Sequence, residues 1–163
     1  MEGVAGKKII QYLYAKKRVI NNDLSIRVVS DCMSPLIRVN DVIEVKYSDV
    51  YTTGNVVAVY IKDNIYIHRI ISIEDDLVIT KGDKSFTADV PVDPKMIIGM
   101  VSKNITQGKI LNNTNISSKL IVFMSKMEYR LFEKMKTESG HKKLKAIYYI
   151  RKYIDVLYKR CSA

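Results

Sequence analysis

The hydrophobic period of the sequence changes once, near residue 115, and this change constrains the fold most. Before it, turn-forming residues such as Thr53-Gly54-Asn55 and Lys81-Gly82-Asp83 separate short β-branched and aromatic runs. The runs occupy residues 42–47, 56–61, 65–73, 77–80 and 96–101. Asp63-Asn64 lies between two of them and predicts a tight hairpin. Because no helical pattern intervenes, the runs predict an antiparallel sheet or partial barrel.

After residue 115, apolar residues recur at intervals of three and four, the period of an amphipathic helix. Gly140 divides two such stretches, so we expect two helices with a break near this glycine. Residues 4–20 predict a short N-terminal helix. The expected fold class is therefore α+β. A mainly antiparallel β core over residues 24–110 follows a basic N-terminal helix in 1–23 and precedes a basic helical extension over 111–163.

The net charge of +10 is spread unevenly along the chain. Residues 1–23 hold five Lys or Arg against two Asp or Glu, 24–110 hold ten against eleven, and 111–163 hold twelve against four. Two cysteines make no disulfide framework and fit a reducing compartment. The apolar runs, such as Leu120 to Met124, are far shorter than the roughly 20 residues that span a bilayer. We expect a cytoplasmic protein, or one bound to a membrane surface, without a transmembrane segment.

One segment carries specific chemistry: residues 30–35 read Ser-Asp-Cys-Met-Ser-Pro, followed by Leu36 and Asn40-Asp41. It resembles the nucleophile box of type I signal peptidases, Ser-x-Ser-Met-x-Pro followed by Leu-x-x-Gly-Asp. Cys32 stands where that family has its nucleophilic serine, and Asn40 stands where it has glycine.

Three later segments extend the resemblance to the ER-type branch of this family, in which histidine replaces the lysine base. Ile67–Ile70 reads Ile-His-Arg-Ile, residues 80–83 read Thr-Lys-Gly-Asp with Asp89 beyond them, and residues 99–101 read Gly-Met-Val. Their order and spacing agree with the family over about residues 26–104, roughly half of the chain.

The resemblance implies a role for each of five residues. Cys32 would be the nucleophile and His68 the general base, with Asp83, in preference to Asp89, orienting the imidazole. Ser30 would offer its hydroxyl to the oxyanion, beside the backbone N–H of Cys32. This chemistry is coherent, because a neighbouring imidazolium favours the reactive thiolate and histidine titrates near neutrality. No cofactor or metal is implied.

Cysteine in place of serine leaves three interpretations open: a thiol peptidase, a weakened or retired enzyme, or an engineered trap. The leading hypothesis is an endopeptidase that removes a leader or signal segment from a peptide or small protein precursor. One alternative is an inactive peptide-binding module. Another is an SOS-repressor-type autoprotease, for which Val4-Ala5-Gly6 offers an Ala-Gly bond, although that family uses a lysine base.

The basic residues of the C-terminal stretch suggest a docking role apart from the chemistry. They include Lys142, Lys143, Lys145, Arg151, Lys152, Lys159 and Arg160. This face is either simply solvated or binds an anionic membrane surface or an acidic partner, such as a leader peptide. Nucleic acid is a weaker candidate, because the sequence has no zinc-ligand set, glycine-rich phosphate loop or aromatic RNA-binding motif.

Overall fold

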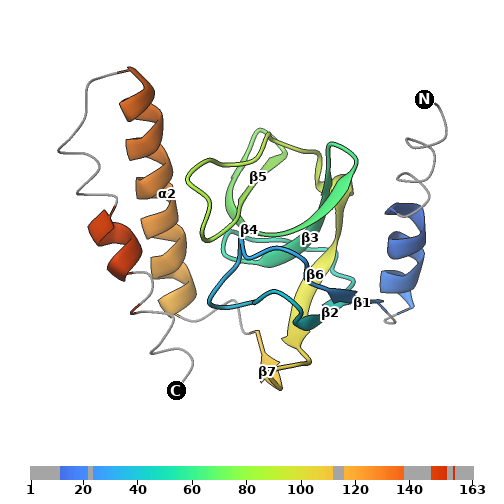
Figure 1. Cartoon of the computed structure of the whole chain (residues 1–163). Coiled ribbons are helices and arrows are strands. Elements are labelled where there is room, and N and C mark those ends of the chain that lie inside the picture. The colour runs from blue at the N-terminus through green and yellow to red at the C-terminus, as the bar shows by residue number, and fades with distance from the viewer. Residues whose placement is uncertain (1–11, 22–23, 112–115, 138–147, 154–155, 157–163) are drawn as a thin grey trace, which may run out of the picture.

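The computed structural model describes residues 12–21, 24–111, 116–137, 148–153 and 156 (Figure 1). Within these ranges, one open antiparallel sheet of seven strands is accompanied by helical segments, which confirms the predicted α+β class. No helix in the described part of the chain is long and apolar enough to cross a bilayer.

The sheet has the strand order β1-β2-β6-β3-β4-β5, and β7 pairs with β6. Its strands are β1 (Leu24–Arg27), β2 (Val42–Lys46), β3 (Val56–Ile61), β4 (Asn64–Glu74), β5 (Leu77–Lys81), β6 (Ile97–Asn104) and β7 (Lys109–Ile110). A short 3-10 turn, η1 (Pro94–Met96), precedes β6, so the run expected from residue 96 begins as a strand at Ile97.

Strand β3 is buried on both faces, which explains its unbroken apolar sequence Val-Val-Ala-Val. Val56 and Ala58 enter one hydrophobic cluster, whereas Val57 and Val59 enter another on the opposite face. The sheet thus separates two cores, and its central strands are fixed from both sides.

The predicted hairpin lies between β3 and β4, one residue earlier than expected. Lys62 and Asp63 form the turn with φ angles of 45° and 63°, while Asn64 already pairs with Ile61. Two consecutive positive φ angles are those of a type I′ turn, whose twist matches that of the flanking strands.

Helical segments pack beside the sheet. Residues 12–20 are helical, and Ala15 and Val19 join the cluster that contains the core residues of β2 and β6. The other helices are α2 (Ile116–Thr137) and a segment at 148–153, whose Ile150 packs with Ile121 of α2. In Figure 1, α2 and the helix at 12–20 lie on opposite sides of the strands.

Two of the expectations fall partly outside the described residues. These are the start of the N-terminal helix, at 4–11, and the break at Gly140. The division into segments 1–23, 24–110 and 111–163 remains a prediction.

Candidate active site

The segment that contains Cys32 follows β1 and is anchored by its own apolar residues. Met33 and Ile37 are fully buried in the larger core, and the Ile37 amide donates to the carbonyl of Met33 in a single helical turn. Cys32 therefore lies half-buried at the surface of a rigid support. The hydroxyl of Ser30 lies 3.1 Å from its sulfur, so the structure brings these two predicted residues together.

His68 is held in β4 by a carboxylate from another segment. Its Nδ1 lies 2.6 Å from Oδ2 of Asp89, and the imidazole is almost completely buried. Asp89 is itself fixed by Thr80 of β5, whose hydroxyl donates to the same Oδ2 at 2.6 Å and whose carbonyl accepts from the Asp89 amide. Because Asp89 engages Nδ1, the ring nitrogen that remains for a reacting group is Nε2.

Cys32 and His68 interact electrostatically. Burial opposes ionisation of the Cys32 thiol, but hydrogen bonds with His68 and Ser30 outweigh it and lower the thiol pKa. For His68, burial disfavours the imidazolium, yet Asp89 and Cys32 raise its pKa from 6.5 to about 9. Opposite shifts in two neighbouring groups favour a thiolate–imidazolium pair at neutral pH. This pairing is the activated state of a nucleophilic cysteine.

The carboxylate that is hydrogen-bonded to His68 is Asp89, whereas the expected one, Asp83, is paired with Arg69. Its two carboxylate oxygens accept from Nε and Nη2 of Arg69, at 2.9 and 2.8 Å, in a bidentate ion pair that is buried on both sides. Arg69 also donates from Nη1 to the carbonyl of Gly54. Asp83 is therefore a structural neighbour of the cysteine, and Asp89 is the carboxylate that orients the histidine.

The turn after β5 lies directly against the backbone of Cys32. The Lys84 amide donates to the carbonyl of Cys32 at 2.8 Å. A Cβ atom at Gly82 would lie 3.0 Å from the Cβ of Cys32 and 3.1 Å from its carbonyl oxygen. The same Cβ would lie 2.7 Å from Oγ of Ser85, so a larger residue at this position would have to shift both Ser85 and Cys32, which gives Gly82 a positional role.

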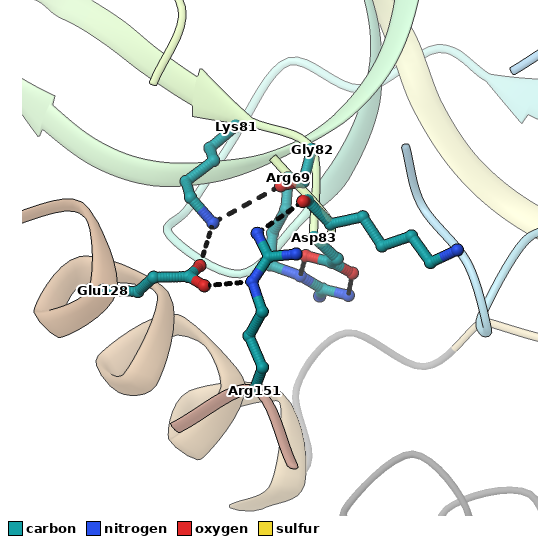
Figure 2. Close-up of polar contacts among 7 residues, drawn as sticks. Arg69, Lys81, Gly82, Asp83, Glu128 and Arg151 are labelled. Atoms are coloured by element: carbon teal, nitrogen blue, oxygen red, sulfur yellow. Dashed lines mark hydrogen bonds and ion pairs between the residues drawn. The ribbon is translucent and has the colours of Figure 1, made fainter. Parts of the chain in front are cut away.

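A second buried cluster, which the sequence motifs did not predict, joins this turn to the C-terminal helices (Figure 2). The carboxylate of Glu128 in α2 accepts hydrogen bonds from Nζ of Lys81 at 2.9 Å and from Nε of Arg151 at 2.5 Å. A signal for it exists in the sequence. Glu128 follows Met124 by four residues and precedes Leu131 by three, which places a lone carboxylate on the apolar stripe of the helix.

Replacing Asp89 with asparagine is expected to lower the pKa of His68 from about 9 toward 6.5, because the imidazolium loses its carboxylate partner. In the native protein the charged imidazole contributes stability fully below pH 6.5, and the contribution is lost as pH rises through about 9. The variant should therefore be less stable than the native protein, with the full difference below pH 6.5 and a difference that disappears as pH rises through about 9. NMR titration of the His68 ring measures the shift. Asp76→Asn, in an exposed turn, is the matched control, and an unchanged titration in Asp89→Asn contradicts the assignment.

Comparisons of the chain with protein family models, with curated proteins and with solved structures found no match.

Proposed function

We propose that the protein is a thiol endopeptidase resembling signal peptidases, which removes a leader segment from a peptide or small protein precursor. The observation that carries the proposal is the ordered series of Cys32, His68 and Asp89. The thiol interacts with the imidazole, and the imidazole is held at its far nitrogen by a fixed carboxylate. Nucleophile, base and orienting group in this order are the constellation of acyl-transfer enzymes.

Catalysis would proceed by acyl transfer in two steps. The thiolate of Cys32 attacks the scissile carbonyl carbon, and His68 gives its proton to the departing amine as the C–N bond breaks. Water then attacks the thioester carbonyl, with His68 accepting a proton from the water, the C–S bond breaks, and the thiolate–imidazolium pair is regenerated. The Ser30 hydroxyl, 3.1 Å from the sulfur, and the backbone N–H of Cys32 would donate to the oxyanion that forms at each step.

The edge of β4 beside Cys32 supports a peptide as the substrate. In a two-residue hairpin, the residues that face the partner strand alternate, so the backbone groups of Ile65 and Ile67 point away from β3. Strand β5 begins to pair with β4 only at Arg69, so within the described residues no strand covers Ile65 and Ile67 on this side.

This edge, unpaired by any described strand, leads to the thiol: the Cys32 sulfur lies 3.8 Å from the carbonyl oxygen of Ile67, a residue that is itself buried. An extended peptide that adds a strand here would bring a backbone carbonyl to the sulfur. Main-chain pairing requires an unfolded segment. A leader peptide provides such a segment, whereas a folded domain does not.

Iodoacetamide labelling tests the activated thiol without knowledge of the substrate. We expect Cys32 to be alkylated at pH 7 about tenfold faster than Cys161 for each unit by which the thiol pKa is depressed. Mass spectrometry of the two cysteine peptides over a time course measures both rates in one sample. The His68→Ala variant should reduce the rate at Cys32 alone. Equally slow labelling of both cysteines in the native protein would contradict the proposal.

A further inference from the structure

The segment from Gly82 to Phe86 is held between two parts of the molecule. On one side it contacts the nucleophile segment, through the Lys84 amide on the carbonyl of Cys32 and the Lys84 ammonium on Asp31. On the other side it contacts the C-terminal helices (Figure 2). The position of Cys32 therefore depends on contacts that begin outside the β core.

Arg151, from the helix at 148–153, makes two of these outer contacts and also binds α2. Its Nη2 donates to the carbonyl of Lys84 at 2.5 Å, and its Nε donates to Glu128. Its guanidinium also lies 3.6 Å from the ring centre of Phe86, which stacks on Phe132 of α2. One side chain thus links the turn to both helices.

Glu128 completes the link from the other end. Its carboxylate is fully buried and accepts from Arg151 and from the equally buried Lys81, whose Nζ lies 3.4 Å from the carbonyl of Gly82. A buried carboxylate between two cations has a fixed position, because moving it leaves one cation without a partner. The Lys81–Glu128 ion pair therefore fixes the position of the first residue of the turn after β5, Gly82.

We infer that Glu128 and Arg151 are positioning residues that hold the Gly82–Phe86 turn, and through it the backbone of Cys32, in register with His68. The inference rests on the proposed function and deepens it, because it makes the two C-terminal helices part of the catalytic unit. Neither residue touches the reacting atoms. They act through Lys84 and Gly82, which fix the carbonyl and the Cβ of the cysteine.

Two substitutions that change the local charge in opposite directions distinguish a positioning effect on Cys32 from a direct electrostatic effect on its thiol. Arg151→Met removes a positive charge, and Glu128→Gln removes a negative one and places an amide N–H group where Arg151 needs an acceptor. Charge alone would move the thiol pKa upward in the first variant and downward in the second. Loss of the alignment between Cys32 and His68 would raise the thiol pKa in both variants, because the thiolate would lose its contact with the imidazolium.

The measurement is the rate of iodoacetamide alkylation at Cys32 against pH, with the native fold checked by circular dichroism at the same temperature. The groups that face the thiol, His68, Ser30 and Asp83, are unchanged in every variant. Lys152→Met is the matched control, since it removes the neighbouring exposed cation and should leave the profile unaltered. Amide exchange at Lys84 reports release of the turn directly.

We expect the alkylation midpoint to rise in both variants, with the rate at pH 7 falling about tenfold for each unit of the rise. Exchange at the Lys84 amide should become faster in parallel. Midpoints that move in opposite directions, or that stay at the native value in Arg151→Met, overturn the inference. If Glu128→Gln does not fold, amide exchange at Lys84 in Arg151→Met decides, because loss of charge alone leaves the hydrogen bond from the Lys84 amide to the carbonyl of Cys32 intact and its exchange at the native rate. Because alkylation needs no substrate, a native protein that cleaves no peptide refutes the proposed function without affecting this result.

Discussion

The Cys32→Ala variant is expected to cleave no peptide, and His68→Ala is expected to lose about 10⁴-fold or more of the native kcat/KM. Alanine at 32 removes the atom that forms the thioester. Alanine at 68 removes the imidazole that favours the thiolate and that, in the proposed mechanism, protonates the leaving amine. Incubation with a proteome-derived peptide library, followed by identification of new termini by mass spectrometry, finds the cleaved bonds. The best substrate among them then gives the kinetic constants.

Controls in the same assay separate catalysis from binding. Cys161→Ala should cleave like the native protein, and intact-mass measurement after an acid quench should find an acyl adduct on Cys32 that hydroxylamine removes. A peptide that binds equally well to native protein and to Cys32→Ala, but is cut by neither, would identify a binding module instead of a peptidase. Cleavage that persists in Cys32→Ala would assign the chemistry to other residues.

The Arg69→Met variant is expected to lose about 3–5 kcal/mol of unfolding free energy, which is the usual effect of removing one partner of a buried ion pair. Arg69 donates to both carboxylate oxygens of Asp83 and to the carbonyl of Gly54, and Asp83 stays buried after the substitution. Urea unfolding followed by circular dichroism measures the loss.

A double variant, Arg69→Met with Asp83→Asn, tests the cause of that loss. It removes the carboxylate that Arg69→Met leaves without its guanidinium, so it should recover a substantial part of the stability. Arg27→Met, which replaces a more exposed arginine of β1, should change the stability by less than about 0.5 kcal/mol. If the double variant is as unstable as the sum of its single changes, the pair does not act as a unit.

The sheet could be predicted from the sequence because its central strands bury both faces or alternate clearly. The run at 56–61 matches β3 residue for residue, because β-branched side chains favour the pleated, buried surface of a strand. Strand β1 was missed because its sequence, Leu-Ser-Ile-Arg, is only four residues long. Its stability comes from pairing with β2, whose nearest partner is 15 residues further along the chain.

The site was predicted in part, and the part that failed depended on three-dimensional register. Cys32, His68 and Ser30 could be chosen from local motifs. The choice between Asp83 and Asp89 could not, because both follow β5 and either could face β4. Arg69 determines which carboxylate meets His68. It follows His68 in β4, so its side chain points to the opposite face of the sheet, where it forms an ion pair with Asp83. The role of Glu128 could not be predicted from local motifs, because its partner, Lys81, lies 47 residues away in sequence.

The ion pair of Lys81 and Glu128 also bears on how the chain can be divided. Both side chains are completely shielded from solvent, one on the sheet and one on α2. A fragment that stops at residue 110 would contain Lys81 without Glu128. It would also expose the surface of the sheet on which this ion pair is buried in the full chain. The charge pattern suggests a boundary at that point, yet the boundary cuts between the two halves of one electrostatic contact. Removing the helices from the β core would therefore leave Lys81 without its ion-pair partner. The smallest fragment that retains this ion pair includes α2, which supplies Glu128.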